Sequence, residues 1–184
     1  IKKAGNPNAY NRKPFSKTEV KKIWDVKDSN IYYTVILMLI YTGCRIGELL
    51  DLKKENVNLE ERYFKIVASK TAAGIRTAPI SEKVHPFFEY WYNLNDCEYL
   101  LSTPEGEHFK YRNYYDSYWS PLIETLGMKH RPHDTRHTCI SMLTVAGVSD
   151  KVIKKIVGHK GQGVTEVVYT HFEIEELIDA INKI

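Results

Sequence analysis

Six polar side chains spread along the chain have the chemistry needed to break a phosphodiester. Such an ester resists attack because its non-bridging oxygens repel a nucleophile and its leaving alkoxide needs a proton. An enzyme that works without a metal must therefore supply cations, a nucleophile and an acid. Arginine suits the first task, since its planar fork donates two parallel hydrogen bonds to phosphate oxygens and stays charged. The candidates are, in chain order, Arg45, Lys70, His133, Arg136, His159 and Tyr169.

These candidates stand in distinctive local sequences, which read Thr42-Gly43-Cys44-Arg45-Ile46-Gly47-Glu48-Leu49, Ser69-Lys70-Thr71, His133-Asp134-Thr135-Arg136-His137, Gly158-His159 and Val168-Tyr169. In this order they resemble the motifs of the tyrosine recombinases. The resemblance runs from about Phe15 to His171, and it is strongest to the integrases of phages and conjugative transposons. It implies a mainly α fold with a small antiparallel β-sheet (α+β), the tyrosine recombinase catalytic-domain fold.

The resemblance implies that Arg45 and Arg136 bind the scissile phosphate and that Glu48 steadies Arg45. Spacing supports the second arginine, because His133 and Arg136 are three residues apart and would share one face of a helix. The plainer alternatives are a surface ion pair between Arg45 and Glu48 and a helix-capping His133 with a solvated Arg136. His137, next in line, is expected to point elsewhere, to pack or hydrogen-bond within the fold, and to stay outside the catalytic set.

Tyr169 would be the nucleophile, although one tyrosine among thirteen proves nothing by itself. It lies ten residues after His159, where the family has its nucleophile. Attack would leave a 3′-phosphotyrosyl link and a free 5′ hydroxyl. By the same resemblance, His133 takes or returns the tyrosine proton, His159 binds the phosphate, and Lys70 protonates the departing 5′ oxygen.

The Lys70 assignment has the strongest rival, because lysines are common on solvated faces of hairpins. Lys65 and Arg76 are the neighbours with which Lys70 could be confused.

Taken together, the motifs predict a site-specific recombinase that acts on double-stranded DNA without metal or other cofactor. The resemblance adds four protomers that exchange strands through a Holliday junction. Two other functions stay open: a type IB topoisomerase-like enzyme that relaxes DNA, and a DNA-binding module that has lost its chemistry. A covalent protein–DNA adduct would separate the enzymes from the module.

Length and charge fit one catalytic domain with a basic entry segment. The chain has 184 residues and a net charge of +3, and roughly 100–200 residues is a common domain size. Residues 1–22 hold seven Lys or Arg against one Glu. We expect residues 1–14 to be a basic interdomain linker in a fragment of a longer protein, with Lys2, Lys3, Arg12 and Lys13 contacting DNA.

Cysteine use and hydropathy favour a soluble protein in a reducing, intracellular compartment, and the resemblance implies the bacterial cytoplasm, in association with the nucleoid. Cys44, Cys97 and Cys139 form no C-x-x-C pair, so neither a disulfide framework nor a zinc site is predicted. The most apolar stretch, Ile31 to Tyr41, is shorter than the roughly 18 residues of a membrane span. No signal peptide precedes it.

Local signals predict helices around the candidate residues. Ser16 and Glu19 have capping-box spacing for a helix through about Val26. A second helix should cover Ile31 to Tyr41, and a short one should follow Gly43 with Arg45 at its amino-terminal end. Further helices are expected over 82–94, 111–126, 135–146 and 151–157, with Ser149-Asp150 as a cap and Gly147 and Gly158 as stops.

Two β-rich segments, 62–67 and 76–80, predict a hairpin with Gly74 in its turn and Lys70 at its edge. We assign residues 15–172 to the catalytic domain. Residues 173–184 form an acidic terminal helix with an apolar stripe of Ile174, Leu177, Ile178 and Ile181. The stripe could fold back on its own domain, but the family favours docking on a neighbouring protomer.

Overall fold

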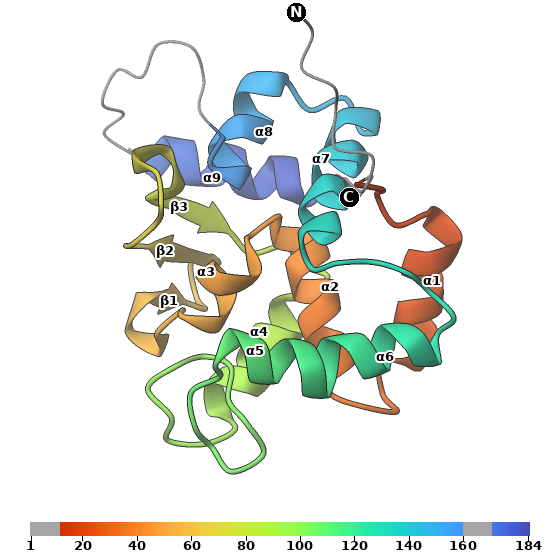
Figure 1. Cartoon of the computed structure of the whole chain (residues 1–184). Coiled ribbons are helices and arrows are strands. Elements are labelled where there is room, and N and C mark those ends of the chain that lie inside the picture. The colour runs from red at the N-terminus through yellow and green to blue at the C-terminus, as the bar shows by residue number, and fades with distance from the viewer. Residues whose placement is uncertain (1–11, 160–170) are drawn as a thin grey trace, which may run out of the picture.

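A computed structural model of the chain describes residues 12–159 and 171–184. Helices surround a central apolar helix, and a small sheet lies to one side (Figure 1). The helices are α1 (Lys17–Val26), α2 (Tyr32–Thr42), α3 (Ile46–Leu50), α4 (His85–Asn93), α5 (Tyr111–Tyr114), α6 (Ser120–Thr125), α7 (His133–Val145), α8 (Asp150–Val157) and α9 (His171–Ile181). The strands are β1 (Val57–Asn58), β2 (Tyr63–Ile66) and β3 (Arg76–Pro79). This confirms the predicted fold class of helices with one small antiparallel sheet.

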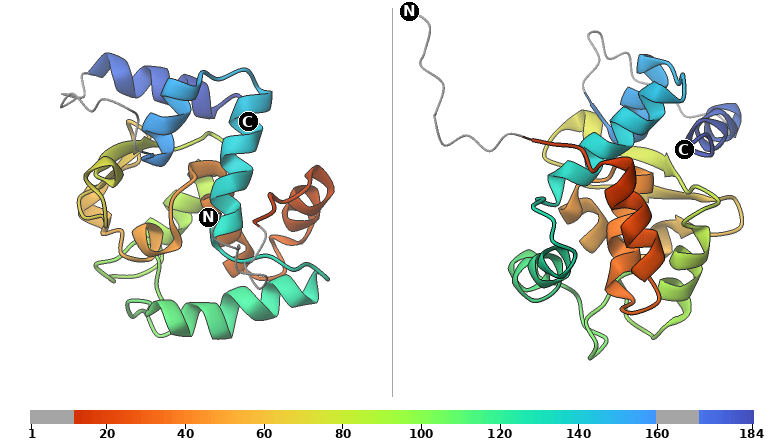
Figure 2. Two further views of the ribbon diagram at one scale, coloured as in Figure 1. Left: turned by 45° about the horizontal axis from the view of Figure 1, so that its top comes forward. Right: turned by 90° about the vertical axis from the view of Figure 1, so that its right-hand side faces the viewer.

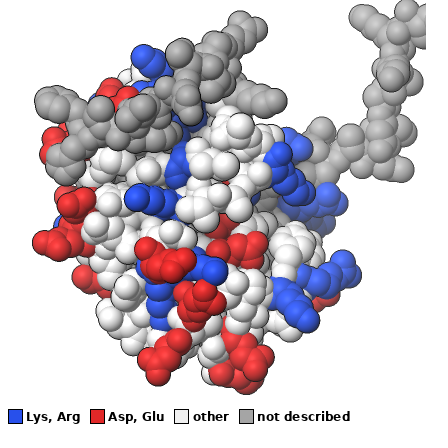
Figure 3. All heavy atoms as spheres, turned by 90° about the vertical axis from the view of Figure 1, so that its left-hand side faces the viewer, with Lys and Arg blue, Asp and Glu red and all other residues white. Residues whose placement is uncertain are grey.

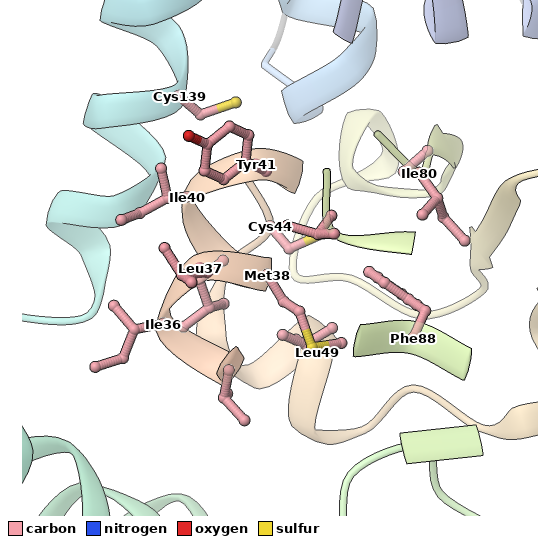
Figure 4. Close-up of a cluster of buried hydrophobic side chains, with 14 of the residues drawn as sticks. Ile36, Leu37, Met38, Ile40, Tyr41, Cys44, Leu49, Ile80, Phe88 and Cys139 are labelled. Atoms are coloured by element: carbon pink, nitrogen blue, oxygen red, sulfur yellow. The ribbon is translucent and has the colours of Figure 1, made fainter. Parts of the chain in front are cut away.

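Helix α2 is the centre of the core because every one of its residues is buried. It packs against α1, α4 and α7, and Figure 4 shows its side chains meeting Leu49, Phe88 and Cys139 from α3, α4 and α7. A helix that is apolar all round needs neighbours on every side. The fold supplies them. No helix in the described part of the chain is long and apolar enough to cross a membrane.

The amino-terminal helix begins as its sequence predicts. Ser16 caps α1, its hydroxyl accepting from the Glu19 N–H at 3.1 Å, while the Glu19 carboxylate accepts from the Ser16 N–H at 2.8 Å. Figure 2 shows α1 beside α2 and α7, and α8 and α9 lying together.

The sheet confirms the predicted hairpin and adds a strand to it. Strands β2 and β3 pair antiparallel and are joined by residues 67–75, which place Gly74 in a 3-10 turn at Ala72–Gly74. The sheet order is β1-β2-β3, all antiparallel, and the short β1 was not predicted. The face that carries the sheet shows acidic and basic side chains interspersed (Figure 3).

Three predicted helices also differ in detail. The expected helix over 111–126 contains a π-helical turn, Tyr115–Trp119, between α5 and α6. Helix α4 starts three residues later than expected. Helix α7 starts at His133, two residues earlier than expected, so His133 lies in its first turn.

Candidate active site

Gly43 shapes the turn that presents Arg45. It ends α2 in the left-handed conformation, φ 67°, and donates its N–H to the Leu39 carbonyl. A Cβ there would lie 2.7 Å from Cγ1 of Val157 and 3.1 Å from Sγ of Cys139. Only glycine satisfies both the conformation and the close approach of α7 and α8. Arg45 follows as the N-cap residue of α3.

Glu48 ties Arg45 in place, as the sequence predicts. Its carboxylate accepts from Nη1 of Arg45 at 3.0 Å and from the Arg45 backbone N–H at 3.0 Å. Burial alone would raise the pKa of Glu48, but the hydrogen bonds and charge of Arg76, then Arg45, outweigh it and lower the pKa. The carboxylate therefore stays ionised beneath both arginines.

Arg76 is a member of this network that sequence reasoning missed, since it appeared there only as a neighbour of Lys70. It opens β3 and is 4% exposed. Its Nη1 and Nη2 donate to the two Glu48 oxygens at 3.2 and 3.1 Å. No local pattern announces this pair, because the partners lie 28 positions apart.

Arg136 is the buried arginine of the site. It is 1% exposed, and its Nη1 donates to the backbone carbonyls of Gly43 and Val157. Its Nη2 is buried and has no hydrogen-bond partner among the described residues. Burial, then the charges of Arg45 and Arg76, lower the pKa of Arg136 to about 10. A buried cationic donor without an acceptor fits an anion such as phosphate.

Three histidines lie close enough to Arg136 for its charge to act on them. The rings of His133 and His137 are 5.1 Å apart, so His137 packs within the fold as expected, but it lies against His133 and does not point away from it. The reason is helical geometry, because positions four apart share one face. Burial, then His137 and nearby arginines, lower the pKa of His133 to about 4. Partial burial, then Arg136 and Arg45, also lower the pKa of His159, although its side chain reaches the surface.

His159 directly follows Gly158, which ends α8 in the left-handed conformation with φ 72°. The sequence predicts Gly158 as a helix stop and Ser149-Asp150 as a cap. The structure confirms both, with the Ser149 side chain accepting from the Val152 N–H. The structure therefore brings together Arg45, His133, Arg136 and His159 from three places in the chain: the start of α3, helix α7 and the residues after α8.

Lys70 lies on the 67–75 loop, is exposed, and makes no ion pair with any described residue. Arg12 and Lys13 are exposed, and the charge of Arg12 contributes to lowering the pKa of both His133 and His137. Tyr169, Lys2 and Lys3 lie outside the described residues. Within 12–159 and 171–184, no three His, Cys, Asp or Glu side chains gather as a metal site would require.

Comparison with known proteins identifies a family and several relatives to which this chain is similar. Residues 13–176 match the Phage integrase family. The chain belongs to this family. Among curated relatives of this integrase-family chain, tyrosine recombinase XerA of Pyrococcus horikoshii is 31% identical over 98% of the chain and 65% of the relative. A tyrosine recombinase XerC-like protein of Caldanaerobacter subterraneus is 26% identical over 92% and 53%. The chain thus spans about two thirds or less of the length of these relatives.

Solved structures show the same fold for this family member. The Tn1549 transposon integrase, solved in complex with a circular intermediate DNA, aligns with a TM-score of 0.72 at 20% identity, over 84% of this chain and 60% of that one. The crystal structure of XerA recombinase aligns with a TM-score of 0.70 at 24% identity, over 83% and 58%. A lambda integrase tetramer bound to a Holliday junction aligns at 0.67 and 17% identity, over 89% and 51%. At these identities the likeness establishes a tyrosine recombinase catalytic-domain fold.

Proposed function

We propose that this chain is the catalytic domain of a site-specific DNA recombinase that cleaves and rejoins double-stranded DNA through Tyr169. The observation that carries the proposal is the buried, unpartnered Nη2 of Arg136 beside Arg45 and the histidines. An exposed arginine pair would only attract DNA, whereas a preorganised buried donor stabilises charge that develops on a phosphate.

The proposed reaction conserves the phosphodiester energy. The Tyr169 oxygen forms a bond to phosphorus and gives its proton to His133, which is neutral at neutral pH because its pKa is lowered. The bond to the 5′ oxygen breaks, and the Lys70 ammonium protonates that oxygen. Arg45, Arg136 and His159 bind the non-bridging oxygens. Reversal with another 5′ hydroxyl rejoins the strands.

A nicked suicide duplex tests this proposal. The wild-type chain should form a covalent adduct that survives denaturing electrophoresis in the presence of a metal chelator. Tyr169→Phe should bind the same DNA and form no adduct. A normal adduct yield in that variant would remove Tyr169 as the nucleophile, and no adduct with the wild type would favour the binding-module alternative.

The proposal extends to assembly and location. We infer that four protomers act on two duplexes through a Holliday junction, as in the lambda integrase tetramer. The setting would be the bacterial cytoplasm, on nucleoid DNA of a phage or conjugative transposon. Analytical ultracentrifugation on junction DNA would test the stoichiometry, and relaxation of supercoils without assembly would instead favour the topoisomerase-like alternative.

Docking of the terminal helix on a neighbouring protomer is also a proposal. In the single chain, α9 packs on β3 and α8, where Ile174, Leu177 and Ile181 are buried. Docking in trans would require α9 to leave this site in the DNA-bound assembly. A chain ending at Phe172 should then fold but lose cooperative assembly. If this chain unfolds, or if assembly and cleavage are unchanged, α9 acts within its own domain.

A further inference from the structure

Arg76 joins three separate elements through one guanidinium. Besides both Glu48 oxygens in α3, it binds the Ile156 carbonyl in the last turn of α8 through Nε at 2.8 Å. It also binds the Gly74 carbonyl, in the loop before β3, through Nη1 at 2.7 Å. Arginine suits this position because its planar fork has five donors, whereas lysine offers three from one point.

Each of these elements carries one of the proposed site residues. Glu48 is shared with Arg45, so Arg76 sets the carboxylate on which Arg45 rests. The Ile156 carbonyl lies three residues before His159. A Cβ on the intervening Gly158 would lie 2.7 Å from Nη1 of Arg76, so the guanidinium packs directly on that turn.

The loop that carries Lys70 is closed at its base beside Arg76. A Cβ added to Gly74 would lie 1.8 Å from Oγ of Ser69 and 3.6 Å from Oε1 of Glu48. Ser69 and Gly74 therefore touch, and Lys70 projects from the short segment between them. Since Lys70 has no ion pair of its own with a described residue, the position of the loop base decides where its ammonium lies.

We propose that Arg76 is a positioning residue for cleavage, which holds the Lys70 loop in register with the Arg45 and Arg136 phosphate site. The inference rests on the proposed function, and Arg76 acts through its neighbours without touching DNA. A misplacement of about 1 Å can lower a catalysed rate by about 10²-fold. Loss of this anchor should therefore reduce cleavage far more than DNA binding.

The test compares ordinary DNA with DNA whose scissile 5′ bridging oxygen is replaced by sulfur. A thiolate leaves without a proton, since thiols ionise with a pKa of about 8.5, so the sulfur substrate does not need Lys70. Lys70→Met provides the reference for this rescue. Arg76→Lys should bind DNA normally, cleave ordinary DNA about 10²-fold more slowly, and regain most of that loss on the sulfur substrate. A merely destabilised protein would lose equally on both substrates.

Two further variants test the position of the Lys70 loop without breaking the buried Arg76–Glu48 ion pair. Arg62→Lys is the matched control, because Arg62 makes an exposed ion pair with Glu82 near the other end of the hairpin, and it should cleave normally. Gly74→Ala should open the loop base by pushing Ser69 aside and should give the same sulfur-rescued loss. Adding Ser69→Gly should relieve that collision and restore cleavage.

The outcomes separate the inference from the proposed function. Normal cleavage by Arg76→Lys, or an equal loss on both substrates with Gly74→Ala also normal, would overturn the positioning role while leaving the recombinase proposal intact. A wild-type chain that forms no adduct on either substrate would overturn the proposed function, and the inference with it.

Discussion

Arg45 and Arg136 face the same site from elements that hold them in different ways. The Arg45 side chain is 32% exposed and stands at the start of α3, where it is steadied by Glu48. Arg136 is 1% exposed, lies in α7 and is anchored by two backbone carbonyls. Arg45 is therefore partly solvated and is held by the Glu48 carboxylate, whereas Arg136 lies in the protein interior.

The difference shows that folding has already removed water from the charged group of Arg136 but only partly from that of Arg45. Removing water from Arg136 is unfavourable, as its lowered pKa shows, and a phosphate at its open Nη2 would offset that loss. Arg45 has kept part of its hydration and gains less from the same contact. We therefore expect substitutions at the two positions to differ in both cleavage and stability.

Replacing Arg136 should have the largest effect. Arg136→Lys keeps a cation but cannot serve Gly43, Val157 and a phosphate together. Cleavage at saturating DNA should fall about 10³-fold, and the free energy of unfolding should drop by about 1–3 kcal/mol because buried carbonyls lose donors. Single-turnover adduct formation and urea denaturation measure the two changes. A loss no greater than at Arg45, with unchanged stability, would show that burial confers nothing special.

Arg45→Lys should have an intermediate effect. Cleavage should fall about 10²-fold, as for the loss of one transition-state donor, with far less change in DNA affinity. Stability should change by about 0–1 kcal/mol, since the lost contact is partly exposed and Glu48 keeps Arg76. Equal losses in cleavage rate and affinity would mean that Arg45 only holds DNA.

The histidines beside Arg136 should make the DNA-free domain sensitive to acid. The pKa of His133 is lowered from 6.5 to about 4, so between these values the unfolded chain binds a proton that the folded chain does not. The free energy of unfolding should therefore fall as pH drops through this window. His133→Asn should reduce the slope in denaturation curves measured across it. An unchanged slope would place the acid sensitivity elsewhere.

The smallest effect should come from the exposed entry segment. Replacing Arg12 and Lys13 by Ala should reduce the slope of log binding constant against log salt by about 2. The cleavage rate at saturating DNA should change little, because Arg12 is only one of several groups that lower the pKa of His133. Lys21→Ala is the control, because Lys21 is also exposed but is paired with Asp25 in α1. If the double variant matches the control, residues 12 and 13 are a solvated tether.

Local signals account for what the sequence predicted correctly in the fold. The capping box of Ser16 and Glu19 and the helix-ending Gly43 and Gly158 each depend on residues a few positions apart. The features that the sequence did not predict carry no such local signal. Strand β1 has two residues, too few for any periodicity, and the π-helical turn at Tyr115–Trp119 looks like ordinary helix in sequence.

By itself, the sequence determined the family, the class of fold and the chain order of the candidate residues, because motifs and capping signals are written in adjacent positions. Only the tertiary structure decided that Arg136 would be buried with its Nη2 left without a hydrogen-bond partner among the described residues. It also decided that His137 would pack against His133 and that Arg76 would share Glu48 with Arg45. The Arg76 bond to Ile156 spans 80 positions. Contacts of that range depend on how α3, α7, α8 and β3 pack, and packing leaves no local pattern.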